Sequence, residues 1–320
     1  MEKYVIGIDG GGTGSKGITA ALDGTVLRMF TGGATNYNGG KKEEIDENLR
    51  ALFREATKEH AISSCQAVCI GSAGVSNRRA VEYLEQAARD MGFTCPVLVA
   101  ADSETAHAGA LNNEEGIILI AGTGAICFGK KKNKETLRTG GYGHLIDDEG
   151  SAYDIARRML RAVVRAADGR ADETVLRELI FRQLQIKTLE ELIAWLYKRD
   201  RTKKEIAGLA SLIPEAERAG DKAAQEILQE AAEALVELTL PMVEFFNKKA
   251  VIALSGSVLK RNRTVRETYC RMLRERYSAG FGTKEGLLIQ EAEHEADYGA
   301  VLLALECAGD GKEAYGKDRN

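Results

Sequence analysis

The six cysteines of this 320-residue chain, at positions 65, 69, 95, 127, 270 and 307, include no C-x-x-C pair. The absence of that spacing argues against a metal or redox centre built from cysteines. We also expect no secretory signal, since Met1-Glu2-Lys3-Tyr4 leads directly into an apolar segment. We therefore expect reduced thiols that serve as ordinary core or surface residues.

No apolar run is long enough to span a bilayer, and positive charge is not in excess, because 44 Lys and Arg stand against 48 Asp and Glu. The net charge of -4 gives no electrostatic reason to expect nucleic acid or an anionic membrane as a partner. We expect a cytoplasmic protein. Its length indicates two domains, each with a sizeable core.

The stretch GIDGGGTGSKGITAALDGTVL, residues 7–27, contains the letters of a dinucleotide-binding fingerprint, G-x-G-x-x-G, at residues 12–17. Its Gly-Ser-Lys also resembles part of a Walker phosphate loop. Both motifs need a helix after the glycines, so that phosphate lies at the helix N-terminus. Here two short apolar runs follow, and Asp23-Gly24 between them is typical of a hairpin turn. The stretch predicts a glycine loop between antiparallel strands, which excludes both motifs.

Short apolar runs alternate with helical patterns along much of the chain. The runs are Tyr4–Ile8, Ala67–Ile70, Pro96–Ala100, Gly116–Ile120 and Val251–Leu254, and the helical patterns between them cover Lys41–His60 and Arg79–Met91. This alternation is typical of an α/β fold. Residues 150–249 are instead rich in helical pattern, with an apolar stripe in Asp221–Pro241.

The pattern of strand, glycine loop and strand occurs twice. Residues 117–129 repeat the arrangement of residues 6–19, with Gly122-Thr123-Gly124 in place of Gly10-Gly11-Gly12-Thr13. Either loop alone could be an ordinary glycine hairpin. Together they indicate two related domains that face each other across a cleft, each with backbone N–H groups for one part of a triphosphate.

Two further features complete the predicted nucleotide site. Asp9 precedes the first loop, where a carboxylate suits phosphate only if Mg²⁺ lies between them, typically through water. Leu254-Ser255-Gly256-Ser257 follows a strand and offers backbone for adenosine. The candidate nucleotide-binding residues are Asp9, Gly10, Gly11, Gly12, Thr13, Lys16, Gly122, Thr123, Gly124, Gly256 and Ser257.

The ordered series GIDGGGTGSKG, LIAGTGAI and ALSGSV resembles the superfamily of sugar kinases, Hsp70 and actin. Within it the chain is similar to N-acetylglucosamine kinases and BadF/BadG/BcrA/BcrD-type ATPases. The most specific part is GGYGHLIDDEGSAY, residues 140–153, which is close to the sugar-pocket segment GGWGHxxGDEGSAY of the kinases. The resemblance implies two ribonuclease-H-like domains with a nucleotide cleft, and phosphorylation of an amino sugar from MgATP, at the C6 hydroxyl of N-acetylglucosamine.

The resemblance also implies the roles of individual residues. Asp102 matches the catalytic base, and the sugar contacts are Asn36, Asp102, Tyr142, Gly143 and Asp148. Thr13 and Thr123 match ATP contacts, and Gly256 an adenosine contact. Tyr142 replaces a tryptophan and Asp147 a glycine, so the preferred amino sugar is left open.

From the residues alone, capping is an equal alternative: Asp102 could be the N-cap of a helix over Ser103–Leu111, and Asp148–Ser151 could cap the next helix. His144 is assigned a structural role.

The implied domains are residues 1–112, rejoined by a C-terminal helix near 296–308, and residues 113–295, which include a helical insertion in the helix-rich region 150–249. Residues 309–320 are expected to form a solvated tail. The expected partners are a sugar and ATP, with a homodimer as a further expectation.

Other acceptor sugars and other classes of protein stay open as alternatives. N-acetylmuramic acid or glucosamine could be the acceptor. Some relatives are dehydratase activators that hold an iron–sulfur cluster between subunits, for which Cys127 has no convincing second partner. An actin- or Hsp70-like protein would use ATP to change shape and bind a protein partner. A sugar-responsive regulator would need a DNA-binding module before the first strand.

Overall fold

The computed structural model describes residues 2–12, 14–37, 41–75, 77–247, 249–281 and 286–309. The chain divides into two compact units, Met1–Glu115 with Ala292–Asn320 (unit 1) and Gly116–Glu291 (unit 2). The domain ranges expected from the sequence, 1–112 with 296–308 and 113–295, stay a prediction. The expected tail lies outside the described residues from position 310 on.

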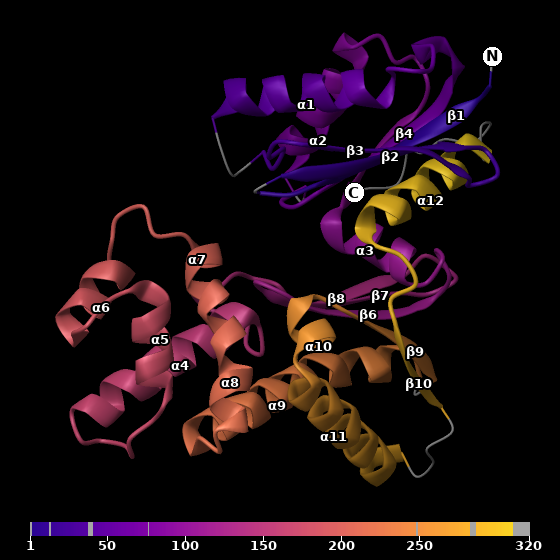
Figure 1. The fold of residues 1–320 in the computed structure, drawn as a ribbon. Helices are drawn as coiled ribbons and strands as arrows, with labels where there is room; N and C mark the ends of the chain where they lie inside the picture. Colours follow the sequence, from indigo (N-terminus) through magenta and orange to yellow (C-terminus); the bar gives the residue numbers. More distant parts are fainter. Residues whose placement is uncertain are drawn as a thin grey trace. The chain divides into compact units, whose positions relative to one another are not determined.

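Unit 1 contains a five-stranded sheet in the order β3-β2-β1-β4-β5 (Figure 1). Its strands are β1 (Tyr4–Gly10), β2 (Ser15–Ala21), β3 (Val26–Gly32), β4 (Cys65–Ser72) and β5 (Val97–Ala101). Its helices are α1 (Lys42–Ala56), the 3-10 turn η1 (Ile62–Ser64), α2 (Arg78–Asp90), α3 (Asp102–Ala110) and α12 (Ala296–Gly309). β1, β2 and β3 form an antiparallel meander, whereas β4 and β5 are parallel to β1.

Alternation along β1 explains why both faces of this sheet are covered. Ile6 and Ile8 belong to the core under α1 and α2, whereas Val5 belongs to the core formed with α12 (Figure 1). Gly7 lies where α12 approaches the strand, since a Cβ there would be 2.4 Å from the backbone nitrogen of Val301. The C-terminal helix is therefore packed directly against the central strand of the N-terminal sheet.

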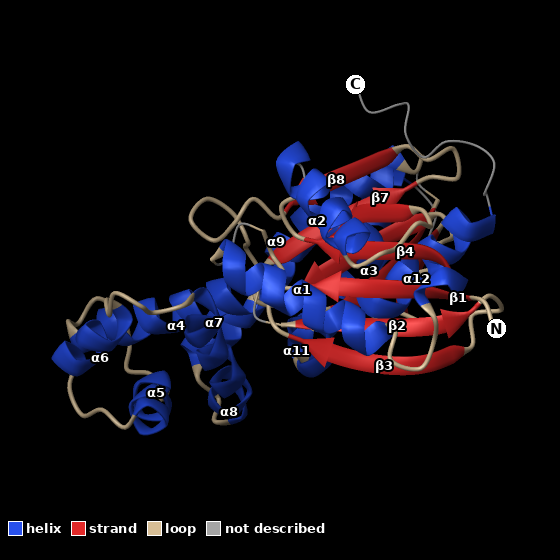
Figure 2. Cartoon of the chain, turned by 90° about the horizontal axis from the view of Figure 1, so that it is seen from above, coloured by secondary structure: helices blue, strands red, loops and turns tan. Residues whose placement is uncertain are grey.

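Unit 2 contains a second five-stranded sheet, in the order β10-β9-β6-β7-β8. Its strands are β6 (Gly116–Ala121), β7 (Ala125–Lys130), β8 (Thr136–Gly140), β9 (Ala250–Ser255) and β10 (Leu287–Glu291). Its helices are α4 (Ala152–Ala167), α5 (Leu176–Leu184), α6 (Leu189–Leu196), α7 (Lys203–Gly208), η2 (Leu209–Leu212), α8 (Ile213–Arg218), α9 (Lys222–Phe245), α10 (Ser257–Arg261) and α11 (Arg263–Phe281). We call α5 to α8 the helical insert; Figure 2 shows it gathered away from the strands of its own unit.

The two sheets have the same topology. β6, β7 and β8 form an antiparallel meander as β1, β2 and β3 do, and β9 and β10 extend it in parallel as β4 and β5 do. The repeated strand, loop and strand pattern in the sequence is thus the start of a repeated five-stranded sheet, and the expected fold class is confirmed.

Apolar runs do not reveal the two edge strands of unit 2. β8 (TLRTG) and β10 (LLIQE) carry polar residues and leave much of their surface exposed, as strands at a sheet edge commonly do. Among the described residues, no helix combines the length and the apolar character that crossing a membrane requires. None of the six cysteines is in a disulfide.

Candidate active site

The first glycine loop joins β1 to β2, and the antiparallel pairing of these strands confirms that it is neither a Rossmann nor a Walker loop. The backbone N–H of Gly11 donates to the carbonyl oxygen of Gly14 at 3.1 Å. Gly10 is required by crowding, because a Cβ there would lie 2.5 Å from Oγ1 of Thr35. Thr13, an expected ATP contact, lies outside the described residues.

The segment that carries Asn36 lies beside this loop. The backbone N–H of Thr35 donates to the carbonyl oxygen of Gly11 at 3.2 Å, and Oγ of Ser15 and Oγ1 of Thr35 are 2.8 Å apart. A Cβ on Gly12 would lie 3.9 Å from the amide nitrogen of Asn36. The fold of unit 1 thus brings an expected sugar contact next to an expected phosphate loop.

Carboxylates gather around Asp9 at the end of β1. The pKa of Asp9 is raised to about 6, first by burial and then by the negative charges of Asp297, Asp102 and Glu295, against the opposing effect of Lys16. Lys16 faces Asp9 directly in the β1–β2 ladder. Asp297 is buried in the first turn of α12 and was not among the predicted site residues. This corner of unit 1 therefore has an excess of negative charge that favours a bound cation.

Asp102 is the first residue of α3, not its N-cap. Ala101 occupies the N-cap position, and its backbone N–H donates to Oε2 of Glu104 at 2.8 Å. Oδ1 of Asp102 accepts its neighbour's N–H, from Ser103, at 2.9 Å. The capping alternative for Asp102 is therefore wrong, and its exposed side chain can be reached by a substrate.

The second glycine loop, Gly122 to Gly124, joins β6 to β7 in unit 2. The N–H of Gly122 donates to the carbonyl oxygen of Gly124 at 2.9 Å, and the carbonyl oxygen of Gly122 accepts the N–H of Ala152 at 2.8 Å. Gly256, with φ of 91°, lies against the strand that leads into this loop: a Cβ there would be 2.3 Å from the carbonyl oxygen of Ala121. Ser257 follows as an exposed first residue of α10. The second phosphate loop and the expected adenosine loop are thus neighbours.

The loop between β8 and α4 carries the aromatic residue of the expected sugar pocket. Tyr142 is 62% exposed, and the guanidinium carbon of Arg138 lies 4.5 Å from its ring centre. The N–H of Tyr142 donates to Oδ2 of Asp147 at 2.8 Å, which closes the loop. Gly143 between them has φ of 95°. His144 meets Tyr153 edge to face, with ring centres 4.8 Å apart, which supports a packing role for His144.

Asp148 is the buried member of this loop, with 3% of its surface exposed. Its Oδ1 accepts the N–H of Ala125, the residue after the second glycine loop, at 3.0 Å. Its Oδ2 accepts a hydrogen bond of 2.6 Å from Nζ of Lys203 on α7. Both carboxylate oxygens are therefore engaged within unit 2. Lys203 was not identified from the sequence, where it is one of many charged residues in a helical region.

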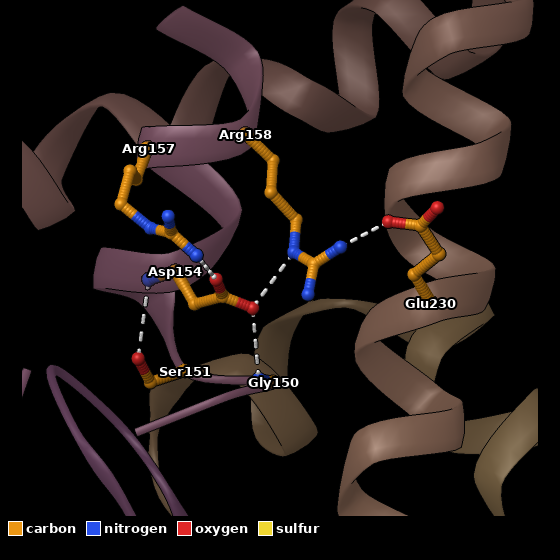
Figure 3. A network of polar contacts seen from close by, with 6 residues as sticks. All are labelled: Gly150, Ser151, Asp154, Arg157, Arg158 and Glu230. Atoms are coloured by element: carbon orange, nitrogen blue, oxygen red, sulfur yellow. Dashed lines mark hydrogen bonds and ion pairs between the residues drawn. The ribbon is translucent and has the colours of Figure 1, made fainter. Parts of the chain in front are cut away.

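A second buried carboxylate fixes the end of the same loop, as Figure 3 shows. Asp154 on α4 accepts hydrogen bonds from the N–H of Gly150 at 3.1 Å and from both Arg157 and Arg158. Arg158 also pairs with Glu230 on α9. Ser151 is the N-cap of α4 and accepts the N–H of Asp154 at 3.2 Å. The capping interpretation is thus right for Ser151 and wrong for Asp148.

Behind this loop lies a cavity of about 470 Å³ between β8 and α9. Five carboxylates line it, from Asp147, Glu149, Glu230, Glu233 and Glu237, together with Arg158. Such a cavity repels phosphate, so the nucleotide is not expected there. Cys127, the cysteine considered for a shared iron–sulfur cluster, is fully buried in β7, and burial raises its pKa to about 12. It does not reach a surface that a second subunit could share.

Comparison with known proteins decides the family. The model of the BadF/BadG/BcrA/BcrD ATPase family matches residues 6–304. The chain belongs to this ATPase family. ATP is accordingly its nucleotide substrate, and the resemblance drawn from the motifs is confirmed.

Two relatives that align with nearly the whole chain are named as sugar kinases. The chain is 35% identical over 311 residues to the N-acetylmuramic acid/N-acetylglucosamine kinase of Clostridium acetobutylicum. This alignment covers 95% of this chain and 99% of that protein. It is 27% identical to the N-acetyl-D-glucosamine kinase of Dictyostelium discoideum, with the same coverage.

Solved structures agree on the fold. A protein of Chromobacterium violaceum is 28% identical, with a TM-score of 0.75 over 95% of this chain and 99% of that one. A glucokinase of the ROK family from Streptomyces griseus, 20% identical, has a TM-score of 0.61 over 94% of this chain and 98% of that one. The latter likeness concerns the fold alone.

Proposed function

We propose that this family member is an ATP-dependent amino-sugar kinase that transfers the γ-phosphoryl group to the C6 hydroxyl of N-acetylglucosamine. The names of its relatives support an amino sugar as the acceptor. The structural observation that carries the proposal is Asp148, which ties the loop of Tyr142 to the residue after the second glycine loop. The loop proposed to bind the sugar and the loop proposed to bind phosphate are thereby joined.

In this reaction Asp102 acts as the general base. Its exposed carboxylate accepts the proton of the attacking hydroxyl, a contribution of about 10²- to 10⁴-fold to the rate. Asn36 orients sugar hydroxyls, and Asp148 does so with the lone pairs that Ala125 and Lys203 leave on its oxygens. Tyr142 packs on the sugar ring with Gly143 beside it. The glycine loops hold the phosphates through backbone N–H groups, so that most of the catalysis is positioning and charge stabilisation.

Mg²⁺ is part of the proposal, with Asp9 as the residue that would hold it. Among the described residues no three His, Cys, Asp or Glu side chains form a metal site. This suits Mg²⁺, which commonly keeps several waters and uses one or two carboxylates together with the phosphates. The raised pKa of Asp9, caused first by burial and then by neighbouring carboxylates, supports a bound cation there. When bound there, Mg²⁺ would neutralise part of the phosphate charge.

The acceptor has one specific alternative. Arg138, held against the ring of Tyr142, places a positive charge beside the expected sugar platform. A carboxylate on the sugar would find a partner there, and this favours N-acetylmuramic acid as a second acceptor; glucosamine has no such support. We place the reaction in the cytoplasm, and a homodimer stays a prediction.

The test is a coupled assay of ADP release with MgATP and a panel of N-acetylglucosamine, N-acetylmuramic acid, glucosamine and glucose. The proposal expects ADP release that depends on an N-acetylated sugar, with a phosphorylated sugar as the product in mass spectrometry. ATP hydrolysis that no sugar stimulates, or iron bound to the purified protein, would overturn it.

A further inference from the structure

Lys203 brings its ammonium group against the second glycine loop. Nζ of Lys203 lies 2.6 Å from Oδ2 of Asp148. A Cβ added to Gly124 would lie 2.7 Å from Oδ1 of Asp148 and 3.0 Å from Nζ of Lys203. The ammonium group therefore stands directly beside the backbone that is expected to receive phosphate.

The position of Lys203 is fixed by its helix start. It is the first residue of α7, after the N-cap Thr202, whose side chain accepts the N–H of Glu205 while Glu205 accepts the N–H of Thr202 in return. The Lys203 side chain is 28% exposed, whereas that of Asp148 is 4% exposed. The ammonium can thus reach both the buried carboxylate and a ligand on the solvent side.

The ion pair of Lys203 with Asp148 affects how the second glycine loop can bind phosphate. A buried carboxylate beside a phosphate loop repels the phosphates of a nucleotide unless a cation neutralises it. Lys203 neutralises Asp148, and an ammonium group has three donors, so it can serve a carboxylate and a phosphate oxygen at the same time.

We propose that Lys203 is a phosphate-binding residue, which bridges Asp148 and the terminal phosphates of ATP at the second glycine loop. The inference rests on the proposed function in that ATP must bind at this loop. It assigns to the helical insert a direct part in nucleotide binding that the sequence motifs do not indicate.

The same helix start is connected to the chain's single tryptophan. The guanidinium carbon of Arg201 lies 3.9 Å from the ring centre of Trp195 on α6, and Nε of Arg201 donates to the carbonyl oxygen of Trp195 at 2.9 Å. Arg201 also pairs with Glu205 on α7. The fluorescence of Trp195 therefore supplies a check that the insert keeps its fold in each variant.

The experiment measures the Kd of Mg-AMPPNP by calorimetry for Lys203→Gln, Lys203→Arg and the control Lys204→Gln, which changes the exposed neighbouring lysine. Losing a hydrogen bond to a charged group corresponds to a Kd about 10- to 100-fold weaker for Lys203→Gln. Lys203→Arg should recover part of the affinity and Lys204→Gln should retain all of it. The Kd of adenosine, which lacks phosphates, should be unchanged in every variant.

A double variant separates phosphate binding from mere neutralisation of Asp148. If Lys203 only neutralises Asp148, then Asp148→Asn/Lys203→Gln and Asp148→Asn bind Mg-AMPPNP equally, and the inference is overturned. If Lys203 binds phosphate, the double variant is again about 10- to 100-fold weaker. The double variant leaves no unpaired carboxylate, so it also serves where Lys203→Gln alone fails to fold. Wild-type protein that binds no nucleotide would contradict the proposed function itself, whereas tight binding by both wild type and Lys203→Gln would contradict only the role of Lys203.

Discussion

The backbone N–H of Ala125 donates to Oδ1 of Asp148 at 3.0 Å, so one buried carboxylate joins the start of β7 to the loop that follows β8. Asp148 has φ of 73°, a left-handed conformation that Asp and Asn tolerate better than most residues. The bond to Ala125 and the ion pair with Lys203 together hold it there. The loop with Tyr142 is therefore set by a polar anchor as well as by packing.

Replacing this anchor should reduce stability in a graded way. Asp148→Ala leaves the N–H of Ala125 without its acceptor, and we expect a loss of about 2 kcal/mol in the free energy of unfolding, moderated because Lys203 is partly hydrated. Asp148→Asn keeps an acceptor and tolerates the left-handed backbone, so its loss should be smaller. Urea unfolding of the three proteins measures this, and equal stability of Asp148→Ala and wild type would refute the anchor.

Asp9 should make the ligand-free protein less stable as the pH rises. Its pKa in the folded protein, about 6, lies above its usual value of 3.8, so folding favours the protonated form. The contribution of protonated Asp9 to the stability of the folded protein is fully present below about pH 4 and is lost as the pH rises through 6. Asp9→Asn stays uncharged at every pH and keeps this stability. Its free energy of unfolding should therefore exceed that of wild type by about 1–3 kcal/mol at pH 8 and equal it at pH 3.5.

The check is the free energy of unfolding of both proteins across this pH range without nucleotide. Asp9→Asn should at the same time lose the effect of Mg²⁺ on ATP affinity, because the amide carries no charge. A variant that is less stable than wild type at pH 8 would show that the Asp9 carboxylate is well compensated in the folded protein.

Tyr142 should act on the sugar and not on the fold. Because its side chain is 62% exposed, Tyr142→Ala should leave the unfolding temperature nearly unchanged, while raising the KM for the sugar about 10-fold and sparing the KM for ATP. The matched control is Tyr197→Ala, which removes a 79% exposed tyrosine in the helical insert. Equal increases in both KM values for Tyr142→Ala would assign the residue a purely structural role.

The sequence predicted the two glycine loops and their strands because each is local: the turn, the strands and the glycines lie within about twenty residues. It could not show Asp297 beside Asp9, because α12 returns to β1 from the other end of the chain. Lys203 was missed for the same reason, since its partner Asp148 lies in a different helix-loop segment of the sequence. Such pairs are set by tertiary packing, which leaves no periodic pattern.

The capping alternatives show a second limit. Asp102 and Asp148 are both good N-cap residues by type, yet Ala101 and Ser151 occupy the N-cap positions of α3 and α4. Residue type alone does not fix a helix start to the residue: Ala101 has no side chain that accepts an N–H, yet it occupies the N-cap position of α3.

The proposed kinase activity depends most on Asp102 as the base, and its direct measurement is sugar-dependent ADP formation by Asp102→Asn. The variant keeps the shape of the side chain and removes only its proton-accepting charge. We expect kcat to fall by about 10²-fold or more, with the Kd of Mg-AMPPNP unchanged because the glycine loops and Asp9 are intact. A variant that phosphorylates the sugar at a near-normal rate would contradict the account.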